Sequence, residues 1–152
     1  MTVEIESVEA LKGMVGTHLG YGEYHRVTQE EVNIFADATG DHQWIHVDPE
    51  RAKAESPFGG PIAHGYLTLS LIPLLMSGMM RVGGIKMGVN YGTNKVRFPS
   101  PVPVGSDVRA GASIAAVEEI PGGVQVALDV TVEVKDAPKP SCVAQVVFRY
   151  YV

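Results

Sequence analysis

The C-terminal part of the chain alternates apolar and polar residues with a period of two, and this pattern constrains the fold more than any other feature. It recurs in three successive segments between positions 108 and 152. A period of two places the apolar residues on one face of a β-strand and the polar residues on the other. The sequence therefore predicts long strands with one buried face. The three apolar faces are Val108, Ala110, Ala112, Ile114 and Ala116; Val124, Val126, Leu128, Val130, Val132 and Val134; and Cys142, Ala144, Val146, Phe148, Tyr150 and Val152.

Turn residues separate these strands and predict that they are antiparallel. Pro121-Gly-Gly123 lies between the first and second segments, and Asp136-Ala-Pro-Lys-Pro140 lies between the second and third. Short connections rich in proline and glycine are typical of antiparallel neighbours. A fourth and less regular strand is expected from about Ile85 to Phe98, where a proline-rich segment ends it.

The longest apolar run of the chain predicts the element that covers the sheet. We expect one long helix from Ile62 or Ala63 to about Val82, kinked at Pro73, because proline lacks the amide hydrogen that a helix needs. With only about 16 strongly apolar residues, the run is shorter than the roughly 20 that span a bilayer. A helix that is apolar on all sides is one that a domain wraps around. The prediction is a single α+β domain over residues 1–152, with a curled sheet around a buried helix.

Two helices with recognisable start signals are expected before this run. Thr28 and Glu31 fit a capping box, in which the Thr28 hydroxyl accepts from a first-turn amide and Glu31 reaches back, and Gly40 can end that helix. Asp48 is a good N-cap, and Pro49 suits the first position of a second helix.

Composition limits the classes of partner. Charged residues make up 19% of the chain and hydrophobic residues 45%, which is typical of a globular domain. The net charge of −5 and the absence of a Lys/Arg stripe argue against a nucleic-acid partner. The single cysteine, Cys142, excludes an internal disulfide and fits a reducing compartment. Because the sequence shows neither the pattern of a secretory signal nor that of a membrane-spanning segment, we expect a cytoplasmic protein without a membrane partner.

Asp41 and His46 are the residues best suited to chemistry. They lie between Gly40 and Asp48, so both are expected on the loop between the two helices, where functional groups often occur. A carboxylate beside an imidazole can orient a water and exchange its proton, which is general acid–base catalysis. The alternative is that Asp41 caps a turn and His46 forms a local hydrogen bond.

Gly65 is the third candidate. Its amide falls in the first turn of the predicted long helix, where amides have no intrahelical partner and the helix dipole is positive. Because glycine has no side chain, a carbonyl oxygen can approach the amide closely, and such donors stabilise a developing oxyanion. The alternative is a glycine needed for packing against the sheet. We expect the preceding residue, His64, to be structural.

Other site types have less support. His42 and His46 are spaced like the histidines of a zincin, but Gln43 stands where the zincin glutamate would be, and no cysteine pair completes a ligand set. We therefore expect no metal. No glycine-rich segment matches a phosphate-binding or dinucleotide-binding loop. Lys95 and Arg97 share a strand face, which either meets a phosphate or is simply solvated.

Two motifs resemble a known family. The motif Phe35-Ala-x-x-Thr-Gly-Asp41-x-x-x-Ile-His46-x-Asp-Pro, followed by Pro61-Ile-Ala-His-Gly65, resembles the MaoC-like (R)-specific enoyl-CoA hydratases. Gly40-Asp-His-Gln-Trp-Ile-His46 and Asn90-Tyr-Gly-x-Asn-Lys-Val-Arg-Phe98 resemble more closely the branch named after nodulation protein N. The resemblance covers the chain from about Val27 to Val108.

The resemblance implies a hot-dog fold, in which an antiparallel sheet wraps a long central helix. It also implies a homodimer with joined sheets and active sites near the subunit interface. Asp41 and His46 would activate a water that adds to C3 of a trans-2-enoyl thioester, or remove water from an (R)-3-hydroxyacyl thioester. The Gly65 amide would bind the thioester oxygen. No separate cofactor is implied, since CoA or the pantetheine of an acyl carrier protein enters with the substrate.

The sequence departs from the family pattern at two places. Gln43-Trp44 replaces the usual Asn-Pro between the acid and the histidine, so the wall of the pocket differs. Better-studied hydratases also place a serine near the acid, and Pro73 stands at about that position. Either Ser70 or another group supplies that hydrogen bond, or the activity is weaker than the motif suggests. Two other functions remain open: a hot-dog acyl-CoA thioesterase, and a non-catalytic acyl-thioester-binding subunit.

Overall fold

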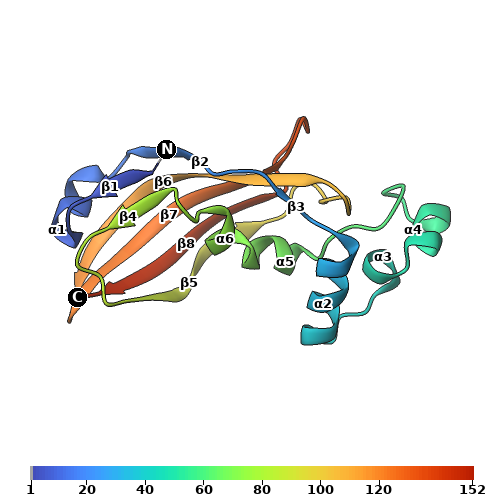
Figure 1. Ribbon diagram of the computed structural model, residues 1–152, viewed down its shortest axis with the longest axis horizontal. Helices are drawn as coiled ribbons and strands as arrows, with labels where there is room; N and C mark the ends of the chain where they lie inside the picture. The colour runs from blue at the N-terminus through green and yellow to red at the C-terminus, as the bar shows by residue number, and fades with distance from the viewer. Residues whose placement is uncertain (1) are drawn as a thin grey trace.

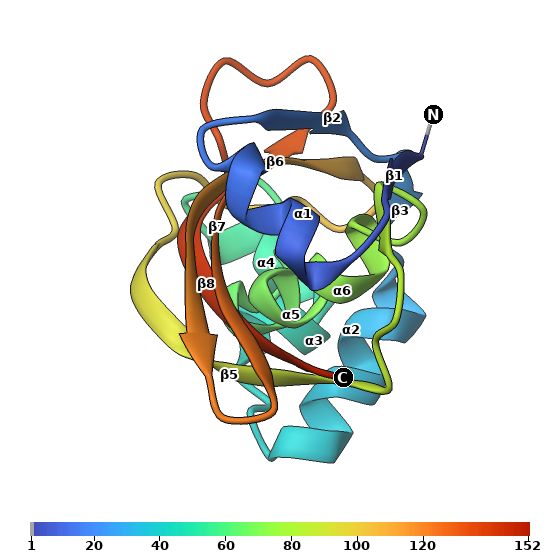
Figure 2. The ribbon, with the colours of Figure 1, turned by 90° about the vertical axis from the view of Figure 1, so that its left-hand side faces the viewer.

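A curved antiparallel sheet wraps around two short helical segments in the computed structural model, which describes residues 2–152. Figure 2 shows the sheet curling around α5 and α6, which lie at its centre. Three further helices, α2, α3 and α4, gather beyond one end of the sheet (Figure 1). This arrangement confirms the predicted α+β fold class, with the sheet curled around a helical core.

The large sheet has six strands in the order β2-β6-β7-β8-β5, with β3 also paired to β6, and all of its pairs are antiparallel. The buried residues of β7 follow the predicted alternation from Val124 to Val132. In β6, a register shift between Ile114 and Ala116 leaves Ala116 exposed, contrary to the sequence prediction. The strands are β2 (His18–Tyr21), β3 (His25–Arg26), β5 (Met87–Arg97), β6 (Asp107–Ile120), β7 (Gly123–Val134) and β8 (Cys142–Tyr151).

The central helix is shorter than the sequence analysis predicted. It consists of α5 (Gly65–Ser70) and α6 (Ile72–Leu75), and the break between them falls just before Pro73, which has no amide hydrogen to bond the carbonyl of Leu69. Beyond α6 the chain turns at Gly78, whose φ is 77°, and continues as strand β4 (Met80–Val82). The prediction that the helix continues to about Val82 is therefore wrong. Within residues 2–152, no helix has the length and apolarity needed to cross a membrane.

The N-terminal segment explains why the helix ends early. Strand β1 (Val3–Ile5) pairs in parallel with β4, so residues 80–82 gain backbone hydrogen bonds that a longer helix would forgo. Helix α1 (Val8–Leu11) and the 3-10 turn η1 (Lys12–Met14) follow and bring the fully buried Leu11 into the core. This pairing joins residues 3–5 to residues 80–82, and no local sequence pattern predicts it.

The two helices with start signals form as predicted. Helix α2 (Gln29–Thr39) begins at Thr28, whose hydroxyl accepts from the Glu31 amide, and ends at Gly40 with a φ of 82°. The Glu31 side chain does not complete the capping box, because its carboxylate bonds the ring of His25 instead, at 2.9 Å. Helix α4 (Pro49–Glu55) begins at Asp48, which accepts from the Arg51 amide.

The core predicts a clear stability effect. Leu128 on β7 is fully buried, so Leu128→Ala is expected to lower the free energy of unfolding by about 2–5 kcal/mol through lost burial and a new cavity. Ile34 on α2 is 61% exposed, and Ile34→Ala is expected to change it by less than about 0.5 kcal/mol. Urea unfolding of both variants measures the difference. Equal losses would contradict this assignment of the core.

Candidate active site

Asp41 and His46 come together at the end of the sheet where α2, α3 and α4 gather. Asp41 lies on the loop after α2, as predicted, and its side chain is exposed. His46 is not on a loop but on the short helix α3 (Trp44–Val47), and it is only 7% exposed. One carboxylate oxygen of Asp41 accepts from the amide of Gln43 at 3.3 Å, so Asp41 also closes the turn that leads into α3.

The hydrogen bond of His46 fixes the form of its ring. Nδ1 lies 2.7 Å from the backbone oxygen of Ile62, and because a carbonyl only accepts, Nδ1 carries the proton. Nε2 of the neutral ring is therefore free to accept a proton. Burial lowers the pKa of His46 from its ordinary value, and this effect outweighs the hydrogen bond to Ile62, which raises it. The neutral ring favoured by this environment is the form that a general base requires.

His64, which the sequence analysis considered structural, belongs to the same cluster. Polar side-chain atoms of Asp41, His46 and His64 all lie within 4.8 Å of one another. The ring of His64 is 2% exposed, and its Nε2 lies 2.9 Å from the backbone oxygen of Asp41. No spacing rule connects position 64 with positions 41 and 46, because the fold alone brings them together.

The two histidine rings are poorly arranged for holding one metal ion. They are stacked, with centroids 4.0 Å apart and planes inclined by 25°. A ring nitrogen binds a metal in the plane of its ring, so two nearly parallel rings cannot both direct a lone pair at the same ion. His42, the other histidine of the zincin-like spacing, lies outside the cluster and pairs with Asp37 at 2.9 Å.

Gly65 is the first residue of α5 and is half-buried. Its amide lies in the first turn, so it lacks an intrahelical acceptor. A Cβ added at Gly65 would lie 3.0 Å from the Phe98 ring, so the packing alternative is also met, against Phe98 after the end of β5. A single position thus combines an amide that has no acceptor within residues 2–152 with a neighbour that leaves little room for a side chain.

A cleft of about 350 Å³ brings His46 and Gly65 to one surface. We call it the His46 cleft. Thr68 of α5 lies beside them, and most of the remaining wall is apolar, which suits an acyl chain. Phe58 and Phe98 also line the cleft and were not predicted as site residues, because Phe58 lies in a loop without a motif and the motif that ends at Phe98 does not show its contact with Gly65. The lining consists of His46, Phe58, Ile62, Ala63, Gly65, Thr68, Phe98, Pro99, Ser100, Pro101, Val102 and Ser141.

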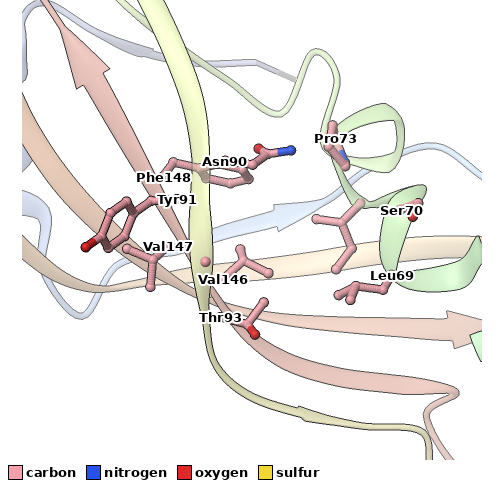
Figure 3. Close-up of a pocket in the computed structure, with 11 residues that line it drawn as sticks. Leu69, Ser70, Pro73, Asn90, Tyr91, Thr93, Val146, Val147 and Phe148 are labelled. Atoms are coloured by element: carbon pink, nitrogen blue, oxygen red, sulfur yellow. The ribbon is translucent and has the colours of Figure 1, made fainter. Parts of the chain in front are cut away.

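A second cavity of about 330 Å³ lies between the helical segments and the β5 and β8 strands. Figure 3 shows Leu69, Ser70 and Pro73 on its helical side, facing side chains from the two strands. Its lining includes neither Asp41 nor His46. Ser70 and Pro73, the positions considered for the family serine, therefore line this second cavity. No hydrogen bond joins Ser70 to Asp41 within residues 2–152.

Lys95 and Arg97 lie away from the cluster. Lys95 lines a separate depression over the strands with Asp129 and Gln145, and Arg97 donates to the backbone oxygen of Val96. Neither residue lines the His46 cleft. Both residues are exposed to solvent.

Comparisons with known proteins give a consistent result. Residues 11–136 match the model of the family described as MaoC like domain. The chain is 56% identical over 146 residues to 3-hydroxyacyl-thioester dehydratase Z of Mycobacterium tuberculosis, covering 95% of this chain and 96% of that protein. It is 44% identical over 140 residues to nodulation protein N of Rhizobium meliloti, covering 91% and 87% respectively.

Solved structures agree in fold. An (R)-hydratase from A. caviae, described as involved in PHA biosynthesis, matches with a TM-score of 0.71 and 25% identity, covering 88% of this chain and 94% of that one. A monoamine oxidase regulatory protein from Archaeoglobus matches with a TM-score of 0.77 and 23% identity, covering 100% and 99%. The second similarity supports the fold alone.

The lowered pKa of His46 predicts a pH dependence of stability. The unfolded chain binds a proton at this ring at a higher pH than the folded protein does, so stability falls as the pH drops through the ordinary histidine pKa of roughly 6.5. The loss stops below the folded pKa. His46→Asn removes the titrating ring and is expected to reduce this loss between about pH 7 and pH 5.

Urea unfolding at several pH values measures this effect. The pKa of His42 is raised, chiefly by its hydrogen bond to Asp37, so it acts in the opposite sense, but it is common to both proteins. An identical pH dependence in His46→Asn and wild type would contradict the assignment.

Proposed function

We propose, from the premise that this chain belongs to the MaoC-like domain family, that it interconverts trans-2-enoyl thioesters and (R)-3-hydroxyacyl thioesters. Its relatives include named 3-hydroxyacyl-thioester and 3-hydroxybutyryl-CoA dehydratases, so the chain is a hydro-lyase of the hydratase and dehydratase type. The observation that carries the finer proposal is the shared surface of the His46 cleft. A base and a free amide line the same apolar cleft, with the Asp41 carboxylate beside the base.

In the proposed hydration, a water lies between the Asp41 carboxylate and Nε2 of His46. It loses a proton to this pair as its oxygen bonds to C3 of the enoyl group. The electron pair of the C2–C3 double bond moves toward the thioester, and negative charge develops on the thioester oxygen. The Gly65 amide donates to that oxygen. The pair then delivers the proton that it took from the water to C2, so one water has been added and the pair is restored, and dehydration follows the same steps in reverse.

The apolar wall supports this chemistry. Phe58, Phe98 and Val102 line the cleft beside the base, and a nonpolar wall strengthens the interaction of the Gly65 amide with the developing charge. The acyl group would occupy the cleft, while the CoA or acyl-carrier pantetheine would extend toward solvent. No cofactor beyond the carrier of the substrate is needed in this scheme.

The experiment follows the conjugated enoyl thioester absorbance of crotonyl-CoA during incubation with the purified protein. We expect loss of absorbance and an (R)-3-hydroxy product. Asp41→Asn and His46→Gln are expected to lower kcat by about 10²-fold to 10⁴-fold, because each removes part of the proton-transfer pair.

Asp37 and His42 provide a matched control. They form an exposed Asp–His pair at 2.9 Å, but neither belongs to the cluster of Asp41, His46 and His64, and His42, unlike His46, does not line the cleft. Asp37→Asn and His42→Gln should therefore retain wild-type activity. Release of free thiol would instead indicate the thioesterase. Binding of acyl-CoA without turnover, unaffected by Asp41→Asn, would indicate the acyl-thioester-binding subunit.

We also infer that the protein is a homodimer joined through β5. Within the described residues, β5 pairs only with β8, so its other backbone edge is open. Three large apolar side chains of β5 are exposed, with exposed fractions of 53% for Met87, 38% for Val89 and 56% for Tyr91. An open edge with an apolar surface favours pairing with a second copy.

This dimer predicts a specific response to charge. Val89→Lys places a cation on the edge strand and is expected to convert the dimer to a monomer. Light scattering after size-exclusion chromatography measures the mass of both proteins. Ile34→Lys, on the exposed face of α2, is the matched control and should leave the mass unchanged. A monomeric wild type, or a Val89→Lys protein that remains dimeric, would contradict the interface.

A further inference from the structure

His64 contacts or adjoins all three groups assigned to the reaction, and we propose that it is the positioning residue that holds them in one geometry. The proposal rests on the function proposed above. The ring of His64 bonds the backbone of Asp41 and stacks on His46, and its own peptide bond leads to Gly65. Nothing in this scheme requires His64 to touch the substrate.

The first connection fixes the acid. Nε2 of His64 lies 2.9 Å from the carbonyl oxygen of Asp41, so Nε2 carries the proton and donates it to that carbonyl. The hydrogen bond of the Asp41 side chain is local, to the amide of Gln43. The bond from His64 therefore ties the exposed acid loop to the start of α5, twenty-three positions further along the chain.

The second connection fixes the base. The His46 ring is stacked on His64 with centroids 4.0 Å apart, while its Nδ1 is anchored to the carbonyl of Ile62. Phe35 of α2 packs against His64 as well, with ring centroids 4.9 Å apart. His64 is 2% exposed, so this packing leaves it little freedom. The direction of Nε2 of His46 thus depends on the ring beneath it.

The third connection fixes the amide. His64 is the N-cap residue of α5, and its carbonyl oxygen accepts from the amides of Leu67 and Thr68 at 3.1 and 3.2 Å. The backbone of His64 is therefore part of the first turn, and the Gly65 amide follows directly. Because one residue carries the ring and the cap, a shift of α5 would move the base and the acid loop with it.

The unbonded ring nitrogen of His64, Nδ1, indicates more than a packing role for this residue. With the proton on Nε2, Nδ1 is an acceptor, and within residues 2–152 it is buried without a hydrogen-bond partner. A buried acceptor without a partner is costly, and such costs are retained where function requires them. A positive charge on the His64 ring would also repel the protonated form of its stacked neighbour, which lowers the pKa of His46 in addition to the larger effect of burial. Replacing the His64 imidazole with an apolar ring should therefore change how His46 titrates.

The test compares His64→Phe and His64→Gln with wild type and Val126→Ala. Phenylalanine keeps an aromatic ring but cannot donate to Asp41. We expect kcat to fall by about 10-fold to 100-fold with KM changed by less than about threefold, because small displacements of reacting groups cost rate more than binding. The acid limb of the kcat/KM profile should move to higher pH, and NMR titration should show a raised pKa of the His46 ring.

The other two variants separate positioning from stability. The side-chain amide of His64→Gln can still donate to the Asp41 carbonyl, so it should recover part of kcat. Val126 is fully buried on β7, away from the cleft, so Val126→Ala should lower the melting temperature without altering kcat or the pH profile. If His64→Phe does not fold, His64→Gln carries the same measurements.

Two results would overturn the proposal. One is a folded His64 variant with wild-type kcat and an unchanged His46 titration. The other is a loss of activity that follows the melting temperature alone, as in Val126→Ala. A wild-type protein without hydratase activity would refute the proposed function first, whereas an active wild type with normal His64 variants would refute only the positioning role.

Discussion

Covering the apolar face of the sheet is the constraint on which the rest of the structure depends. The buried residues of β6, β7 and β8 form one continuous surface, and α5 and α6 lie against it. Leu67, Ile72 and Leu75 enter this core, which fixes the start of α5 at the end of the sheet. The backbone amides of that first turn are the groups that the core cannot satisfy. The site therefore forms where the buried helix begins, and the need to bury apolar surface also places a donor beside the cleft.

Local patterns predicted most of the fold, and long-range pairing accounts for what they missed. The period of two located the β6, β7 and β8 strands because their side chains alternate between core and solvent. The caps of α2 and α4 were predicted because each depends on neighbouring residues. The end of the central helix was not predicted, since it depends on the pairing of β4 with β1, which lies more than seventy residues earlier in the chain. The same limit applies to Glu31, whose partner is His25 and not the helix cap.

In the candidate site, too, local patterns predicted some residues, and contacts between distant residues account for the others. Asp41, His46 and Gly65 were identified from spacing and from the family motif, and the fold brings Asp41 beside His46 and places His46 and Gly65 in one cleft. His64 was visible in the motif but was assigned a structural role, because neither its stacking on His46 nor its bond to the Asp41 carbonyl can be seen in a sequence. Phe98 belongs to this group as well, since its contact with Gly65 joins the end of β5 to the start of α5.

Backbone carbonyls, and not a buried charge pair, set the protonation of the two histidines. The backbone carbonyl of Ile62 accepts from Nδ1–H of His46, and the backbone carbonyl of Asp41 accepts from Nε2–H of His64. Each neutral ring therefore keeps one nitrogen without a proton. An aspartate bonded to the ring of His46 would raise its pKa and favour the charged form. A carbonyl fixes the tautomer with less electrostatic bias, and burial can then lower the pKa. Within residues 2–152 the exposed Asp41 carboxylate makes no hydrogen bond to the ring of His46, so in the proposed reaction it can bind the water instead of serving as the partner of the ring. In the proposed reaction, this arrangement lets the carboxylate of Asp41 and the Nε2 of His46 act on the same water.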